Sequence, residues 1–219
     1  MGWTLRPGIS FCIAGDRAIF LDLRRDRYFR LDDMVDRAFR DLVKTPGHPK
    51  ASIPSELSRS GLLIATPGDV FPQPQSATAP VSEFDPAHER PATRRSTACA
   101  FGAQLRADWL TRHRPLHWMI ERLVPATASR ACAEMAGPSV MAGIVSAHLS
   151  VDLWLSPHDR CLARSIALLG ALRRRRVAAE LVFGVTARPF AAHCWVEAGG
   201  IVLNDRVEHA RLFTPILVI

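Results

Sequence analysis

Apolar and polar positions alternate over short distances near the N-terminus and then change to a helical spacing. Three β-like apolar runs cover residues 9–13, 18–23 and 27–31. Because these runs are short and separated by turn residues, they predict a small antiparallel three-stranded sheet. Helical patterns follow at residues 33–42, where Met34, Ala38 and Leu42 recur every four residues, and at residues 53–62. A three-stranded sheet that carries helices is therefore expected in this part of the chain.

The C-terminal part has helical patterns first and strand patterns afterwards. The helical patterns cover residues 98–110, 116–123, 140–155 and 160–173. The strand patterns cover residues 177–185, 191–198 and 201–203. A group of helices followed by an antiparallel sheet is typical of the α+β fold class. We therefore predict an α+β protein.

A proline-rich stretch separates these two parts. It contains six prolines among Ser, Thr, Gln and Ala and almost no apolar periodicity. Such a composition is typical of a linker. We predict an N-terminal domain at residues 1–65, a linker at 66–97 and a C-terminal domain at 98–219.

Composition limits the class of protein. The chain has 219 residues, of which 48% are hydrophobic, which is enough for a substantial core. No basic stretch followed by an apolar run opens the sequence, so we expect a cytoplasmic protein. The longest apolar segment, residues 135–155, is interrupted by polar residues and predicts a core helix. The five cysteines are scattered without a CxxC pair, so we expect no disulfide framework and no metal site.

The strong positive charge leaves several partners open. The formal net charge is +7, and arginine supplies 26 of the 28 basic residues because only Lys44 and Lys50 are lysines. Such a surface attracts nucleic acid, acidic peptides or anionic lipid head groups. A basic winged-helix nucleic-acid-binding protein is therefore one alternative. Against it, the predicted helix at 53–62 offers only Arg59 for base contacts, accompanied by Glu56.

One cysteine stands at the start of a helical pattern. Ser156 and Pro157 favour a helix start, which places Cys161 within about the first turn and a half. Free backbone N–H groups and the positive end of the helix dipole favour a thiolate there. Arg160 adds to this effect and Asp159 opposes it. The alternative is that Cys161 is a small buried hydrophobe, as most cysteines are.

Two later segments supply the other parts of a cysteine acyl-transfer site. His193 lies on a predicted strand, and Asp205 follows a predicted turn at residues 198–200. If this turn has three residues, His193 lies opposite Asp205 with β-carbons roughly 5 Å apart. If Gly199 and Gly200 alone form the turn, Asp205 faces the wrong side. We predict the three-residue turn, although His193 and Asp205 taken singly are more typical of a satisfied sheet histidine and of a turn residue.

Three motifs together resemble a known family. They are Cys161-Leu-x-Arg-Ser-Ile-Ala-Leu, His193-x-Trp-Val-Glu and Val202-Leu-Asn-Asp205. In order and spacing they resemble the transglutaminase-like, papain-like cysteine peptidases, specifically the B protein of lasso-peptide biosynthesis. The resemblance covers residues 98–219, and Cys194 departs from it because small residues such as alanine are common at that position. It implies that Cys161 is the nucleophile, His193 the general base and later acid, and Asp205 the carboxylate that orients His193.

A looser resemblance covers the N-terminal part. Residues 18–31 and the helices after them are similar to the small winged-helix-like peptide-binding protein of pyrroloquinoline quinone biosynthesis. In that family a leader peptide adds as a strand beside the third strand of the sheet. The resemblance implies peptide-binding positions in the third strand and against the helix at 53–62. These positions are Tyr28, Phe29, Arg30 and Leu31, of which Tyr28 and Phe29 are equally suited to the core.

Together the two resemblances imply a fused leader peptidase. Its leader-recognition domain and its peptidase domain are joined by the linker, which raises the local concentration of the cleavage site. The expected partners are a precursor peptide and a separate asparagine-synthetase-like macrolactam synthetase, and no nucleic acid or membrane. ATP is expected to be the partner's cofactor, and this chain is expected to need none. A transglutaminase-like transfer of the acyl group to an amine is the alternative that the same three residues leave open.

Overall fold

The N-terminal part is built on a three-stranded antiparallel sheet. The computed structural model describes residues 2–44, 57, 59–75, 79–86, 92–123, 138–152 and 160–219. The sheet has the order β2-β3-β4, and its strands are β2 (Ile9–Ala14), β3 (Arg17–Asp22) and β4 (Arg27–Arg30). The predicted meander is confirmed. A further strand that no apolar pattern predicted, β1 (Gly2–Leu5), pairs antiparallel with β5 (Leu63–Thr66).

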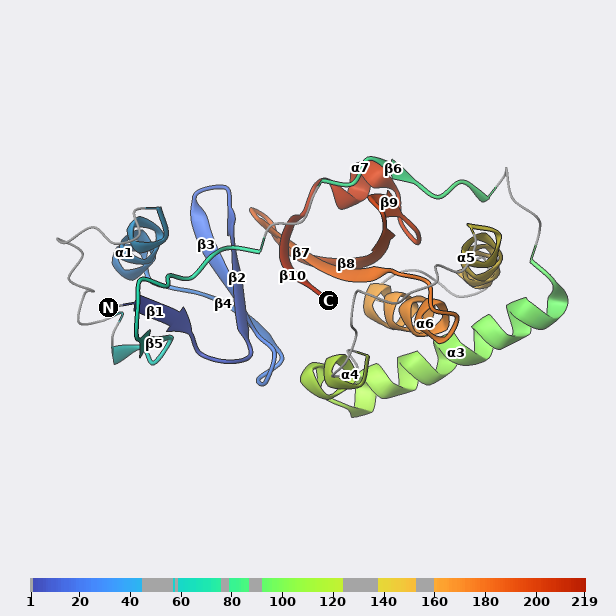
Figure 1. Cartoon of the computed structure of the whole chain (residues 1–219), viewed down its shortest axis with the longest axis horizontal. Helices are drawn as coiled ribbons and strands as arrows, with labels where there is room; N and C mark the ends of the chain where they lie inside the picture. The colour runs from blue at the N-terminus through green and yellow to red at the C-terminus, as the bar shows by residue number, and fades with distance from the viewer. Residues whose placement is uncertain are drawn as a thin grey trace.

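The two faces of this small sheet are covered by different parts of the chain. One face carries Phe11 and Phe20, which pack with Phe39 of helix α1 (Asp33–Lys44). The other face carries Ile19 and Leu21, which belong to the same core as the C-terminal part. In agreement with this, β10 contacts β2 and β3, and Figure 1 shows β10 beside β2. Both faces of β2 and β3 are therefore buried, which explains their nearly continuous apolar sequences.

The helix predicted at residues 33–42 is confirmed as α1, but the apolar residues used to predict it do not all face the core. Met34 is 79% exposed, whereas Phe39 and Leu42 are buried. Asp36 fixes this orientation, because one of its carboxylate oxygens accepts from the backbone N–H of Ala18 at 2.9 Å. A buried carboxylate must keep such a partner, so the helix turns its Asp36 and Phe39 side toward the sheet. The predicted helix at 53–62 lies largely outside the described residues.

The four helices predicted in the C-terminal part are confirmed; the helix at 116–123 has the predicted bounds, and the other three are longer or shifted along the chain. The four helices are α3 (Arg94–His113), α4 (Leu116–Leu123), α5 (Pro138–Asp152) and α6 (Cys161–Arg174). Helix α3 begins inside the predicted linker, where Thr93 Oγ1 accepts from the backbone N–H of Ser96 as an N-cap. None of the described helices is both long and apolar enough to cross a bilayer.

A five-stranded mixed sheet completes the fold. Its order is β10-β7-β8-β9-β6, and its strands are β6 (Ser82–Glu83), β7 (Glu180–Ala187), β8 (Phe190–Ala198), β9 (Ile201–Val202) and β10 (Thr214–Val218). Strand β6 lies within the range predicted as a linker and pairs parallel with β9. The short helix α7 (Val207–Ala210) follows β9, and the backbone N–H of Val207 donates to Glu83. The α+β class is confirmed.

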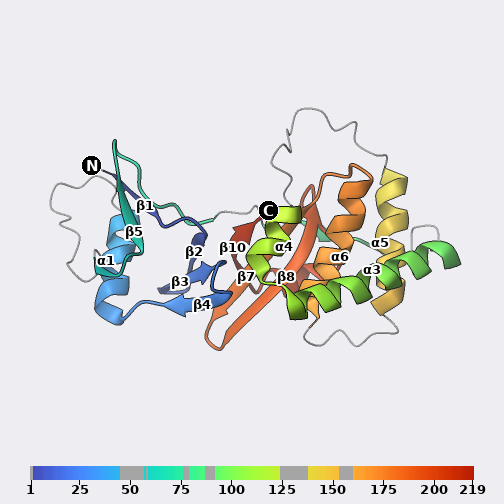
Figure 2. The ribbon, with the colours of Figure 1, turned by 90° about the horizontal axis from the view of Figure 1, so that it is seen from below.

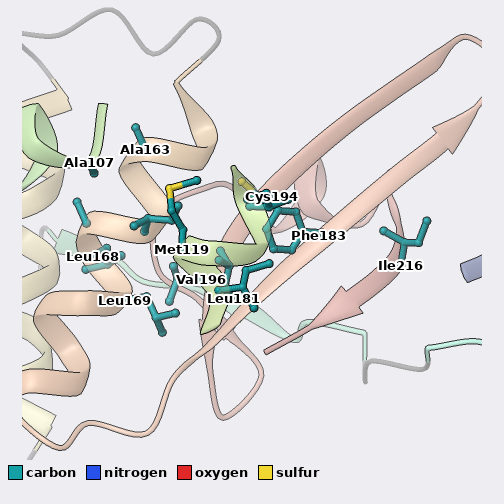
Figure 3. Close-up of a cluster of buried hydrophobic side chains, with 14 of the residues drawn as sticks. Ala107, Met119, Ala163, Leu168, Leu169, Leu181, Phe183, Cys194, Val196 and Ile216 are labelled. Carbon is teal, nitrogen blue, oxygen red and sulfur yellow. The ribbon is translucent and has the colours of Figure 1, made fainter. Parts of the chain in front are cut away.

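Helix α6 is the centre of the C-terminal core. Its residues Leu168, Leu169 and Leu172 are at most 1% exposed and belong to the same cluster as Leu181 and Val196 of the sheet. Figure 3 shows Leu168 and Leu169 on the side of the helix that faces Leu181 and Val196 of the strands. Helices α3 and α5 contact α6 and lie on the same side of the sheet, as Figure 2 shows. The core thus fixes the first residue of α6 against β8.

Candidate active site

Cys161 is the first residue of α6. Arg160 occupies the N-cap position and donates to Asp108, while the predicted cap at Ser156 and Pro157 lies outside the described residues. The Cys161 side chain is partly buried and accepts hydrogen bonds from the side chains of Cys194 and His193. The hydrogen bond from Cys194 lowers the pKa of Cys161 most, burial opposes it, and the bond and charge of His193 bring the pKa to about 4. Such a cysteine is a thiolate at neutral pH.

His193 lies on β8 between Cys161 and Asp205. Its Nε2 is 2.6 Å from Oδ2 of Asp205, which leaves Nδ1 for the hydrogen bond with Cys161. Burial lowers the pKa of His193, but the hydrogen bonds with Asp205 and Cys161 outweigh burial and raise it to about 9. Between these pKa values the site holds a thiolate and an imidazolium, the pair that papain-like chemistry requires.

The predicted three-residue turn before Asp205 is wrong. Glu197 pairs with Val202 and Ala198 with Ile201, so Gly199 and Gly200 alone form the turn. Their φ angles are +57° and +81°, which is the pattern of a two-residue turn that glycines adopt without steric cost. His193 and Asp205 nevertheless meet, because the ladder ends with Leu203, whose backbone N–H donates to the carbonyl oxygen of Val196, and the chain bends out of strand register at residues 204 and 205.

Asn204 fixes this bend, although it was not among the predicted site residues. Its Oδ1 accepts from the backbone N–H of Val196 at 2.8 Å, and its Nδ2 donates to Oγ of Ser165 at 2.9 Å. Ser165 donates in turn to the carbonyl oxygen of Cys194 at 3.2 Å. Ser165 lies one helical turn after Cys161 on the same face of the helix, and this spacing could have identified it from the sequence as a residue near the site. This buried network ties α6, β8 and the bend into one unit.

Asp205 receives hydrogen bonds from three donors. Oδ2 lies 2.6 Å from Nε2 of His193 and 2.8 Å from Nδ1 of His209, and Oδ1 accepts from the backbone N–H of Arg206 at 2.8 Å. Burial raises the pKa of Asp205, but these hydrogen bonds outweigh it and bring the pKa to about 2. Asp205 is therefore a carboxylate throughout the physiological range. His209 was also not predicted, because α7 is too short to show a pattern.

Aromatic rings enclose the histidine. The ring of His193 stacks at 5.9 Å from that of Trp195 and lies 5.2 Å from that of Phe213. Gly184, which pairs with His193 across β7 and β8, leaves room for both rings. A β-carbon there would lie 2.7 Å from Phe213 Cβ and 2.9 Å from the Trp195 ring. The enclosure restricts water around the imidazole and holds its orientation.

One group of side chains has the composition of a metal site. Ligand atoms of His193, Asp205 and His209 all lie within 4.8 Å of one another. Both histidines already use the facing nitrogen to bond Asp205. The hydrogen bonds account for the arrangement, and the absence of a metal stays an expectation.

The four predicted peptide-binding residues point in different directions. Phe29 faces the N-terminal core, with its ring 5.1 Å from that of Phe20, whereas Tyr28 packs against the C-terminal core with its ring 5.6 Å from that of Phe190. Burial is the largest cause that raises the pKa of Tyr28. Tyr28 is therefore the one of the four that packs against the core of the C-terminal part.

Arg30 and Leu31 lie at the open end of β4. Together with Arg17, Asp32 and Asp33 they line a cavity of about 400 Å³. Arg30 is exposed, and β4 is the edge strand of its sheet among the described residues. An edge strand with unpaired backbone groups beside a cavity is suited to binding an extended peptide.

Comparisons with known proteins agree with this geometry. Residues 103–218 match the family described as the transglutaminase-like superfamily. The chain is also similar to the microcin J25-processing protein McjB of Escherichia coli, with 51% identity over 45 residues. That match covers 20% of this chain and 22% of the relative, so the chain spans about a fifth of that protein. No solved structure matches the chain.

Proposed function

We propose that this chain, which belongs to the transglutaminase-like superfamily, is a cysteine peptidase that removes the leader from the precursor of a lasso peptide. The observation that carries the proposal is the hydrogen-bonded series Cys161, His193 and Asp205, assembled from three distant segments. The similarity to a microcin-processing protein supports the choice of substrate class.

The proposed reaction begins with attack of the Cys161 sulfur on the scissile carbonyl carbon. The backbone N–H of Cys161, at the free N-terminus of α6, is one donor for the resulting oxyanion. His193 gives its proton to the leaving amine, and a thioester remains on Cys161. His193 then takes a proton from water, hydroxide adds to the thioester, and the Cys161 thiolate leaves. Asp205 stabilises the imidazolium in both steps.

In the same proposal the N-terminal part holds the leader. The exposed edge of β4 pairs with the extended leader backbone, and the cavity beside Arg30 and Leu31 accepts one of its side chains. Backbone pairing supplies affinity and the cavity supplies specificity. We further propose a leader-recognition domain at 1–65 and a peptidase domain at 98–219. In this proposal a separate macrolactam synthetase uses ATP to close the ring, and both proteins are cytoplasmic.

The test is cleavage of a precursor peptide by the purified protein, followed by mass spectrometry. Cys161→Ala should abolish cleavage, while the variant still binds a labelled leader peptide by fluorescence anisotropy. Cys99→Ala, which removes an exposed cysteine, is the matched control and should cleave normally. Cleavage by Cys161→Ala at the normal rate would exclude the assignment.

Acyl transfer to an amine is the second candidate, since the family is named for it. The same thioester forms, and the difference is the group that attacks it. A labelled primary amine added to the cleavage reaction separates the two. Hydrolysis predicts a free carboxylate on the product, whereas transfer predicts incorporation of the amine.

A further inference from the structure

A second histidine shares the carboxylate that orients His193. His209 lies on α7, and its Nδ1 is 2.8 Å from the same Asp205 oxygen that accepts from Nε2 of His193 at 2.6 Å. The two imidazole rings are 4.7 Å apart. One oxygen of Asp205 thus accepts hydrogen bonds from both histidines. Each of these two hydrogen bonds weakens the other, because both draw on the negative charge of the same oxygen.

We propose that His209 is a positioning residue of the catalytic site, which fixes the Asp205 carboxylate and moderates its pull on the proton of His193. This inference rests on the proposed cysteine peptidase function and deepens it. A carboxylate with a single side-chain donor rotates between two equivalent oxygens. With Oδ1 held by the backbone of Arg206 and Oδ2 shared by two histidines, it has one orientation.

The location of His209 is itself fixed. Its ring meets that of Phe213 edge to face at 5.3 Å, and Phe213 also contacts His193. Strand β6 holds the start of helix α7, because the backbone N–H of Val207 donates to the carboxylate of Glu83. The next residue after α7, Arg211, donates to the carbonyl oxygen of Pro80. The segment before α3 thus supports the site through α7, although its sequence predicted only a linker.

Few other ionisable groups among the described residues face the two histidines. Cys161 on α6 bonds His193, and Cys194 on β8 bonds Cys161. Glu83 on β6 is occupied by the N–H of Val207, and Arg164 on α6 is paired with Asp152 and donates to the carbonyl oxygen of Asn204. The side chain of His209 is 47% exposed, so solvent reaches its outer edge. Asp205 is therefore the direct link between the two imidazoles.

Removal of His209 should raise the pKa of His193. Without the second donor, Asp205 attracts the proton of His193 more strongly, and His209→Ala should shift the titration of His193 upward by roughly half a pH unit. A loss of structure alone would do the reverse, because breaking the bond between Asp205 and His193 lowers that pKa. Asp205→Ala is the control for this reversed sign, with an expected downward shift of roughly one unit or more.

His209→Asn should restore the wild-type titration, since its amide nitrogen takes the place of Nδ1 as a donor. Histidine-selective NMR titration measures these shifts, with the His193 signal assigned by its loss in His193→Gln. The basic limb of the kcat/KM profile for precursor cleavage should move in parallel. His193 signals that stay unchanged or move down in His209→Ala would overturn the inference.

The two readouts separate the two proposals. An upward shift in the NMR titration without cleavage of any precursor would support the role of His209 and refute the peptidase function. Normal cleavage with no shift would do the opposite. Thermal melting followed by circular dichroism shows whether each variant is folded. If His209→Ala does not fold, a His193 titration in His209→Asn that departs from wild type by more than half a unit would overturn the inference.

Discussion

The surroundings of Asp205 and the edge of β4 differ in the way that their two proposed functions require. Around Asp205 every carboxylate oxygen has a donor, and the rings of His193, Trp195 and Phe213 enclose the site. At β4 the strand edge is unpaired among the described residues, and Arg30 is exposed. Proton transfer requires groups that are already oriented, whereas binding an extended peptide requires backbone groups without a partner.

The largest effect on the rate of cleavage is expected when His193, the proposed general base, is replaced. His193→Gln keeps the size and polarity of the side chain but cannot carry a proton to the leaving amine. Cleavage should fall by roughly 10³-fold or more, and the affinity for a labelled leader peptide should stay within twofold of wild type. Single-turnover kinetics and fluorescence anisotropy measure the two quantities. A parallel loss of binding would show that the two regions are not separate.

At the edge of β4, a substitution should weaken binding of the precursor and leave turnover unchanged. Arg30→Glu reverses a charge beside the cavity at the end of β4, so KM for the precursor should rise by about tenfold while kcat is unchanged. Arg106→Glu on α3 makes the same change in net charge at another exposed position and is the control. A fall in kcat with unchanged KM in Arg30→Glu would contradict leader binding at β4.

Cys194 tests how far the thiolate depends on its neighbours. Cys194→Ala removes the hydrogen bond that lowers the pKa of Cys161 most. A hydrogen bond to a charged group corresponds to about one pKa unit or more, so the midpoint for alkylation of Cys161 by iodoacetamide should move up from about 4. Near pH 4 the rate should fall roughly five- to tenfold.

The sign of this change follows from the charge of the nucleophile. Loss of a donor destabilises the thiolate relative to the thiol, so the acidic limb of alkylation and of cleavage moves to higher pH. Cys194→Ser keeps a donor and should stay near wild type. The basic limb, set by His193 with its pKa of about 9, should move little. An unchanged acidic limb in Cys194→Ala would show that His193 and α6 alone hold the thiolate.

The sequence predicted the parts of the fold whose signal is local. The three strands of the small sheet and most residues of α6 follow from apolar periodicity, and the order Cys161, His193, Asp205 follows from motif spacing. What it could not show depends on contacts between distant segments. Strand β6 pairs with β9 across more than a hundred residues, and the face of α1 is set by the bond between Asp36 and the backbone of β3.

The site illustrates the same limit. Asp205 was predicted to face His193 through strand register, but the turn has two residues and the contact is made by a bend. Asn204 and Ser165 hold that bend with bonds to β8, which no pattern of spacing reveals. His193 and Asp205 meet as predicted, but the predicted geometric reason was wrong. A polar network that joins three elements produces no periodic pattern in the sequence from which it could be predicted.

Gly184 provides the smallest expected effect on turnover and the sharpest test of the enclosure. A β-carbon at this position would lie 2.7 Å from Phe213 Cβ and 2.9 Å from the Trp195 ring. Gly184→Ala should lower the free energy of unfolding by about 1–3 kcal/mol and reduce kcat several-fold through displaced rings. Gly143→Ala on α5, where a β-carbon meets nothing within 4 Å, should raise stability by up to about 1 kcal/mol. Urea unfolding measures both changes. Equal stability of the two variants would mean that the rings around His193 move freely, in which case orientation of the imidazole rests on Asp205 rather than on packing.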